Sequence, residues 1–282
     1  MEPVPVRSPS PPDAPVAVDA LVPGPGELGC LLVHGLTGTP AEMMPLATVL
    51  AGRHPLWVVR VAGHATAVTD LATTSWHEWY ASVRAGADAL RAVVPHLVVV
   101  GLSMGALLGL HLAAERPADV AGLVLLSPAA AVGRGVVRWL RRPLRVLGAL
   151  DSRVTPLQAA LARVLFGKGG SDIADAAVRA VHPGYRQVPL RALLQLLALQ
   201  RIARADAPGV TQPVLMIHAT QDHTSPVAAA QDLYARLGSR AKRLVLLEES
   251  FHVVTVDRER TRVQAEVRAF LDGLVASTAA RP

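Results

Sequence analysis

The chain has 282 residues, of which 51% are hydrophobic and 18% are charged. This length and composition supply a sizeable buried core, for one large domain or for a domain with an insertion. The net charge of +6 is local, because residues 131–170 contain eight Lys and Arg against one Asp, and the rest of the chain carries −1. A positive charge that is confined to one segment argues against a nucleic acid as the partner.

A single cysteine, Cys30, excludes an internal disulfide and fits a reducing compartment. No apolar run reaches the length of about 18 residues that a transmembrane helix needs. Residues 1–26 are rich in proline and lack the basic region followed by an apolar region that marks a secretory signal. We therefore expect a disordered leader over residues 1–26 and a cytoplasmic protein.

The first half of the chain alternates between short runs rich in β-branched residues and longer helical patterns. This alternation predicts buried strands at residues 28–33, 56–61, 97–100 and 120–126. It predicts helices between them at residues 40–50, 76–94 and 104–115. Such an order is typical of a parallel sheet with crossover helices.

The alternation stops after the fourth strand and resumes near residue 214. Residues 129–210 show helical patterns interrupted by prolines and no convincing strand, so we expect a helical cap there. Strands at 214–219 and 244–247 and helices at 226–237 and 257–275 complete the chain. We therefore predict an α/β fold with a mostly parallel central sheet flanked by helices. Its core comprises residues 27–128 and 211–277, and the cap is inserted after the fourth predicted strand.

The most specific motif is GLSMG at residues 101–105, which matches G-x-S-x-G. It directly follows the predicted strand and opens an apolar helix, and this strand–turn–helix context is what a nucleophile elbow requires. The flanking glycines suit a sharp turn, because a Cβ beside the strained serine would clash. The motif therefore predicts that Ser103 is a nucleophile. The alternative is a tight strand-to-helix turn that happens to contain a serine.

A serine hydroxyl needs a base to remove its proton and an acid to orient that base. In this fold class the acid and then the histidine follow the serine along the chain. Asp222 lies just beyond the strand at 214–219, and His252 lies just beyond the strand at 244–247. His223 is the competing histidine, but neighbours in sequence, such as Asp222 and His223, rarely face each other at a loop tip. We predict Ser103, Asp222 and His252 as the triad.

The tetrahedral intermediate of acyl transfer also needs donors for its oxyanion. One donor should be the backbone N–H after the nucleophile, which belongs to Met104. The other should be the backbone N–H of Leu36, because His34 and Gly35 turn the chain sharply after the first predicted strand. No spacing among the histidines, acids and cysteine indicates a metal site, and no cofactor is expected.

These motifs together resemble a known family. The stretches LLVHGLTG, GLSMG, ATQDHTSP and ESFHVVTVD are similar to those of the bacterial carboxylesterase and monoacylglycerol lipase group of α/β-hydrolases. The resemblance covers about residues 28–274 and implies hydrolysis of short- to medium-chain carboxyl esters or monoacylglycerols beneath a small helical cap. Ala106 departs from the family pattern, in which a glycine is usual, and the cap is longer and richer in arginine.

The remaining expectations concern the substrate pocket and the cap. We place Gly35 and His64 at the rim of the pocket and Leu193, Leu194 and Leu197 in its apolar ceiling, which suits an acyl chain. The arginine-rich stretch GVVRWLRRPLRVLGAL, residues 135–150, has the pattern of a basic amphipathic helix. Such a helix can contact an anionic lipid surface or guide anionic substrates. The simpler alternative is a lid whose arginines are solvated.

The sequence therefore predicts a serine carboxyl-ester hydrolase that acts on a small-molecule ester through an acyl-enzyme. Other serine-triad reactions, by a thioesterase, an amidase or a C–C bond hydrolase, would use the same motifs. A non-catalytic binding module on the same fold is a further alternative, against which the intact triad argues. The motifs carry no information on the oligomeric state.

Overall fold

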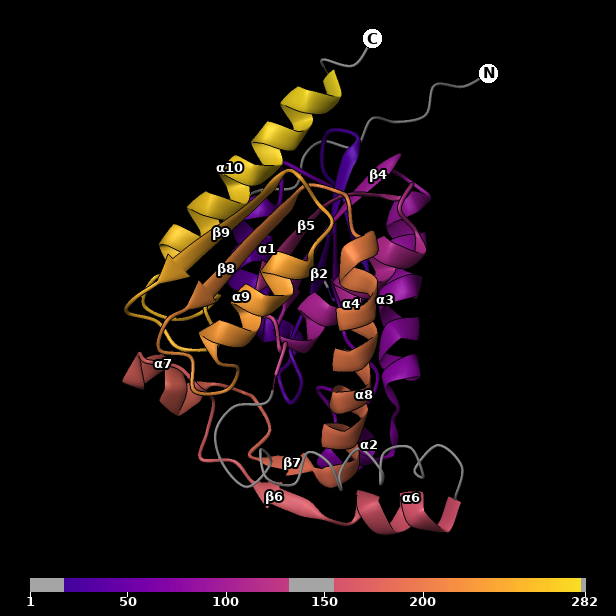
Figure 1. Ribbon diagram of the computed structural model, residues 1–282, viewed down its shortest axis with the longest axis vertical. Helices are drawn as coiled ribbons and strands as arrows, with labels where there is room; N and C mark the ends of the chain where they lie inside the picture. The colour runs from indigo at the N-terminus through magenta and orange to yellow at the C-terminus, as the bar shows by residue number, and fades with distance from the viewer. Residues whose placement is uncertain (1–17, 132–154, 280–282) are drawn as a thin grey trace.

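A computed structural model describes residues 18–131 and 155–279 of the chain. Seven strands form one sheet in the order β1-β3-β2-β4-β5-β8-β9 (Figure 1). Every pairing in this sheet is parallel except that of β1 with β3. The strands are β1 (Leu21–Val22), β2 (Leu28–Val33), β3 (Leu56–Val59), β4 (His96–Leu102), β5 (Val120–Leu126), β8 (Val214–Ala219) and β9 (Lys242–Leu247).

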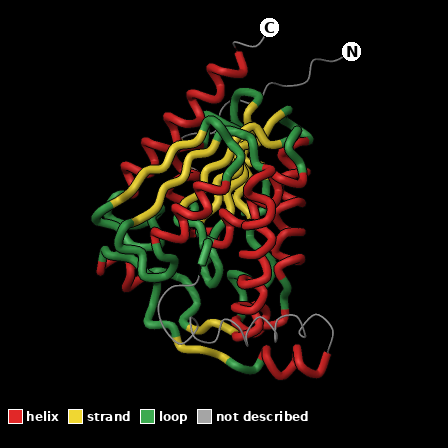
Figure 2. The backbone as a smooth tube through the Cα atoms, in the orientation of Figure 1, coloured by secondary structure: helices red, strands yellow, loops and turns green. Residues whose placement is uncertain are grey.

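Helices cover both faces of this sheet, as Figure 2 shows. In β2, Leu31 and Val33 pack in one core cluster with α3 (Trp76–Arg91), α4 (Met104–Glu115) and α8 (Leu190–Asp206). Cys30 and Leu32 pack in a second cluster with α1 (Met44–Leu50) and α10 (Arg260–Ala279). This alternation follows from the two-residue period of a strand, which points successive side chains to opposite faces. The flanking helices are η1 (Pro40–Glu42), α1 (Met44–Leu50), α2 (Val68–Thr73), α3 (Trp76–Arg91), α4 (Met104–Glu115), α9 (Val227–Arg236) and α10 (Arg260–Ala279).

The predicted fold class is confirmed, and the predicted core elements form with ends shifted by a few residues. The expectation of a disordered leader is wrong for its last residues, because Leu21 and Val22 form β1. The backbone N–H of Asp19 also donates to Val58 (2.9 Å), and its carboxylate accepts from Arg60. Partners far along the chain order this segment, so local composition could not reveal it. The sequence also gave no signal for the short helix α2.

The predicted cap region contains helices and also a small sheet. Its described elements are α6 (Thr155–Ala162), β6 (Leu165–Gly167), α7 (Ala176–Val181), β7 (Gln187–Pro189), α8 (Leu190–Asp206) and η2 (Ala207–Gly209). The expectation of no strand here is wrong, since β6 and β7 pair in antiparallel fashion. Three-residue strands formed by tertiary contacts leave no periodic signal. The arginine-rich stretch at residues 135–150 lies outside the described residues.

The helix α8 links the cap region to the body of the molecule. Its residues Ala192, Leu196, Leu199 and Ala203 belong to the same buried cluster as α3 and α4. Figure 1 shows α8 running alongside α4 from the small sheet toward the central sheet. The core of the body therefore includes side chains of α8, although the predicted cap extends to residue 210. Among the described residues, no helix is both long and apolar enough to cross a membrane.

Candidate active site

Ser103 occupies the sharp turn between β4 and α4. Its backbone has φ 56° and ψ −111°, in the left-handed half of conformational space that L residues rarely adopt. The turn requires both flanking glycines. A Cβ on Gly101 would lie 2.4 Å from the carbonyl of Gly105, and a Cβ on Gly105 would lie 2.2 Å from the carbonyl oxygen of Val33. The G-x-S-x-G pattern thus reflects close backbone packing around a strained serine.

The three predicted triad residues meet at the carboxyl edge of the sheet, where β4, β8 and β9 end. The Ser103 hydroxyl is 2.8 Å from His252 Nε2, and His252 Nδ1 is 2.6 Å from Asp222 Oδ2. With Nδ1 protonated, the imidazole donates to Asp222 and accepts from Ser103. All three side chains are largely buried, so water competes little with these hydrogen bonds.

Backbone and electrostatics fix the charge states of the pair. The N–H groups of Thr224 (2.8 Å) and Ser225 (2.7 Å) donate to Asp222 Oδ1. Burial opposes ionisation of Asp222, but His252, His218 and the Ser225 N–H together outweigh it and lower the pKa of this carboxyl. Burial likewise opposes protonation of His252, but the carboxylates of Asp222, Asp172 and Glu42 together outweigh it and raise the pKa of the imidazole above its ordinary value. These carboxylates therefore favour the imidazolium that forms when His252 takes a proton.

Two backbone N–H groups adjoin the serine without an internal partner. Within the described part of the chain, neither Leu36 N–H nor Met104 N–H donates to a protein acceptor. Met104 opens α4, where the first N–H groups have no partner within the helix. Gly35 allows the close approach of the two loops, since a Cβ there would lie 3.1 Å from the Cβ of Ser103. This arrangement can accommodate an oxyanion next to Ser103.

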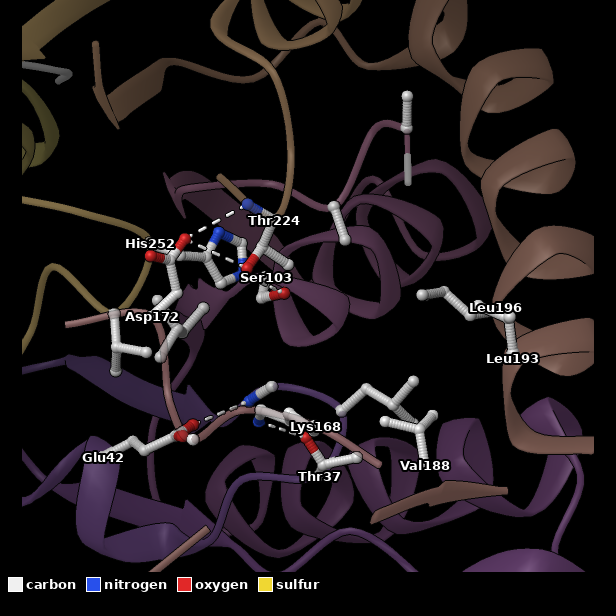
Figure 3. Close-up of a pocket in the computed structure, with 17 residues that line it drawn as sticks. Thr37, Glu42, Ser103, Lys168, Asp172, Val188, Leu193, Leu196, Thr224 and His252 are labelled. Atoms are coloured by element: carbon white, nitrogen blue, oxygen red, sulfur yellow. Dashed lines mark hydrogen bonds between the residues drawn. The ribbon is translucent and has the colours of Figure 1, made fainter. Parts of the chain in front are cut away.

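A cavity of about 280 Å³ opens over Ser103 and His252 (Figure 3). Apolar side chains of the cap region, including Leu193 and Leu196 of α8 and Val188 of β7, line one part of it. Gly35, which we expected at the rim, lines it too, as does Leu36. The expectation for Leu194 and Leu197 is wrong: both are buried but neither lines the cavity. Leu194 is turned by ~100° around α8 from Leu193 and so faces away from the cavity.

His64 does not line the cavity either. It is 1% exposed, and its ring packs edge-on against His34 and Trp79 behind the oxyanion loop. Burial lowers the pKa of His64 to about 4, so the ring is neutral at pH 7. The expectation that it shapes the pocket rim is therefore wrong. The residue follows the predicted second strand as a rim residue would, but the chain turns inward at this point.

Sequence reasoning missed the polar side of the cavity. Thr37, Glu42, Lys168, Asp172 and Thr224 line it, and Figure 3 shows them opposite or beside the leucines. Glu42 lies eight residues after His34, close enough in sequence to be noticed. The residues from the β6–α7 connection carry no local signal, because only the folded cap brings them over the sheet. Among the described residues, no cluster of His, Cys, Asp and Glu could hold a metal ion.

Comparison with known proteins agrees with this geometry. The family described as "Serine aminopeptidase, S33" matches residues 29–259. A thermostable monoacylglycerol lipase from a Bacillus species is 31% identical, over 84% of this chain and 88% of the relative. A carboxylesterase from Bacillus subtilis is 25% identical, over 88% of this chain and 94% of the relative.

Solved structures give the same result. A structure described under the metagenome-derived lipolytic enzymes LipS and LipT has a TM-score of 0.76 and 27% identity, covering 88% of this chain and 94% of that chain. The monoacylglycerol lipase of Paleococcus ferrophilus has a TM-score of 0.72 and 20% identity, covering 91% and 97%, and shows the shared fold. The chain belongs to the serine aminopeptidase, S33 family of serine hydrolases with the α/β-hydrolase fold.

Proposed function

We propose that this protein is a serine carboxyl-ester hydrolase that works through an acyl-enzyme. The observation that carries the proposal is the continuous hydrogen-bonded chain from Ser103 through His252 to Asp222. The relatives that are named monoacylglycerol lipase and carboxylesterase support the same reaction class.

The proposed mechanism assigns one role to each group. His252 removes the Ser103 proton as the oxygen attacks the ester carbonyl, and Asp222 stabilises the resulting imidazolium. The N–H groups of Leu36 and Met104 stabilise the oxyanion. His252 then protonates the leaving alcohol. In the second half-reaction His252 takes a proton from water, which attacks the acyl-enzyme, and Ser103 leaves with that proton restored.

We propose short- to medium-chain acyl esters or monoacylglycerols as the substrates. The leucines of α8 give the acyl chain an apolar surface, and the cavity has the scale of a small-molecule site. On the other side of the cavity, Asp172 and Thr224 offer hydrogen bonds to an alcohol portion. The lone cysteine, buried in β2, fits a protein that works in the reducing cytoplasm.

A substrate panel tests the reaction class. Nitrophenyl esters of increasing acyl length, acyl-thioesters and acyl-anilides are compared by kcat/KM, with Ser103→Ala as the control. We expect esters to be preferred, with a maximum at short to medium chains. A preference for thioesters or anilides would replace the proposal with a thioesterase or amidase. No turnover of any member, together with failure to react with a fluorophosphonate, would favour a non-catalytic binding module.

A further inference from the structure

A buried carboxylate borders the cavity beside the oxyanion loop, outside the triad. Glu42 is 5% exposed, and the backbone N–H of Gly35 donates to its Oε2 (3.3 Å). A Cβ on Gly38 would come within 2.1 Å of this carboxylate, so the loop makes room for Glu42 with a glycine. Glu42 therefore contacts the loop at both ends, on either side of Leu36.

The cap region holds the same loop from the other side. Lys168, which follows β6, donates from Nζ to the Thr37 hydroxyl (2.9 Å). The backbone N–H of Tyr185 donates to the Thr37 carbonyl (2.8 Å). Thr37 itself has φ 62°, a strained conformation for a β-branched residue that the surrounding contacts must maintain. Figure 3 shows Glu42, Lys168 and Thr37 together on the side of the cavity facing Ser103.

The charges of Glu42 and Lys168 depend on each other. Burial raises the pKa of Glu42 to about 7, although Lys168, the Gly35 N–H and His252 act in the opposite direction. Burial lowers the pKa of Lys168, and Glu42 and Asp172 oppose that shift. The ionised pair is the state in which each group compensates the charge of the other.

His182 also faces the carboxylate but contributes no charge. Its Nε2 is 3.5 Å from Glu42 Oε1. Its Nδ1 accepts from the Ser171 hydroxyl (2.7 Å) and from the Gly184 N–H (3.3 Å), which places the single proton on Nε2. Burial lowers the pKa of His182 to about 4, so the ring is neutral at pH 7. Of Lys168 and His182, Lys168 is therefore the one that compensates the negative charge of Glu42.

We propose that Glu42, from the body, and Lys168, from the cap, are oppositely charged positioning residues that hold the Gly35–Gly38 loop from two sides, with its Leu36 N–H directed at the oxyanion. The inference rests on the proposed function, since it assigns a role in stabilising the same tetrahedral intermediate. Neither residue hydrogen-bonds to the triad; both hold the loop, and the charge of Glu42 also acts on His252 through space. An oxyanion donor is effective only when it is held in place before charge develops.

The pair makes a specific prediction for single and double variants. Glu42→Gln removes one of the two carboxylates that act on Lys168, and Lys168→Met leaves the buried Glu42 carboxylate without this cation, whereas the double variant removes both charges. Loss of a whole oxyanion donor costs about 10²–10³-fold in kcat, so its displacement should lower kcat by about tenfold or more with little change in KM. The double variant should be no slower than the slower single variant, because the two residues act as a unit.

The pH profile gives a second readout. The carboxylates of Asp222, Asp172 and Glu42 all raise the pKa of His252, and Glu42 itself takes up a proton near pH 7, within the acid limb of kcat/KM. In Glu42→Gln this limb should therefore move to lower pH and become less steep, because His252 alone then titrates there with one carboxylate fewer beside it. A residue that only fills space would leave the midpoint of this limb in place. Thr37→Val tests the loop contact separately. It removes the hydroxyl that accepts from Lys168 and keeps both charges, and we expect it also to lower kcat.

The experiment measures kcat, KM and the rate of fluorophosphonate labelling for these variants, with thermal unfolding as a check of folding. Arg186→Met is the matched control, because it removes an exposed cation next to β7 and should leave all values unchanged. Unchanged kcat in both single variants, a rise in KM alone, or multiplicative effects in the double variant would overturn the inference. Ser103→Ala distinguishes a failure of this inference from a failure of the proposed function. If Ser103→Ala remained active, the proposed function itself would be overturned.

Discussion

At the scale of residues, two histidines that both follow predicted strands, His223 and His252, have different environments. His252 is buried between Ser103 and Asp222. The His223 side chain is 63% exposed, and its Nδ1 is 2.9 Å from Asp172 Oδ1, outside the triad. Only His252 can therefore take the Ser103 proton. Its raised pKa also sets the pH range in which it is neutral and able to act as a base.

The first prediction concerns this pH range. Because the base must be neutral, kcat/KM should fall as the pH decreases through the raised pKa of His252, with a midpoint above the ordinary value of 6.5. Asp222→Asn should lower kcat by about 10⁴-fold, because the imidazole loses the acceptor that fixes its tautomer. Steady-state rates with a nitrophenyl ester over about pH 5–9 provide the measurement.

The matched control for this prediction is His223→Ala. This variant should keep both the midpoint and most of the activity, since its ring touches neither Ser103 nor His252. A His223→Ala enzyme as inactive as His252→Ala would contradict the assignment of the base.

The sequence predicts the triad and one oxyanion donor but not the residues that the cap brings to the site. Each triad residue follows a strand that a run of β-branched residues predicts. The sequence therefore indicates Ser103, Asp222 and His252 separately, and the fold brings them together. Leu36 was found in the same way, after β2. Lys168 was not, because it approaches the site only through the pairing of β6 with β7. Contacts between distant segments determine the position of Lys168, and neither the composition nor the hydrophobic periodicity of the sequence predicts such contacts.

At the scale of elements, the junction of β4 with α4 depends on how closely two backbones approach. Gly105 lets the first turn of α4 pack on the carbonyl of Val33 in β2, which brings the oxyanion loop next to Ser103. A glycine elsewhere in a helix has the opposite effect. Gly273 lies in α10, where an added Cβ would meet nothing within 4 Å, so the residue only adds flexibility to the unfolded chain.

The second prediction compares these two glycines. Gly105→Ala should lower the free energy of unfolding by about 2–3 kcal/mol, because the clash is with backbone atoms that cannot rotate away. Gly273→Ala should raise it by about 0.5–1 kcal/mol, through helix propensity. Urea denaturation of the two variants gives both values. Equal stabilities would contradict the packing described here.

Element boundaries show a further limit of sequence reasoning. The strands β2, β5 and β8 lie within the predicted ranges, because each is a continuous apolar run buried on both faces. By contrast, β1 is two residues long and forms only by pairing with β3. The helix α8 lies in the predicted cap, yet it packs in the same core cluster as α4. Short or shared elements of this kind are stabilised by tertiary packing rather than by local pattern.

At the scale of the whole molecule, several exposed hydrophobic side chains gather in the cap region. Among the described residues, Val164, Leu165 and Phe166 near β6 and Val181 at the end of α7 are exposed. The arginine-rich stretch belongs to the same region of the sequence but lies outside the described residues. Apolar side chains together with basic ones favour association with an anionic lipid surface.

The third prediction is that the full chain associates with anionic vesicles. In flotation assays we expect more protein on vesicles that contain anionic lipid than on neutral vesicles, with the difference decreasing at high salt because ions screen the attraction. Val181→Ser and Phe166→Ser should weaken association at constant charge. Equal flotation with both kinds of vesicle would contradict the role of charge.

Ser103 is the nucleophile of the proposed mechanism, and covalent labelling can identify the residue that reacts. A fluorophosphonate should add once per chain, on the peptide that contains Ser103, and ester hydrolysis should disappear in proportion to labelling. Ser103→Ala should take up no label and should lose at least about 10³-fold in kcat. Labelling on another residue, or hydrolysis that survives in Ser103→Ala, would contradict the account.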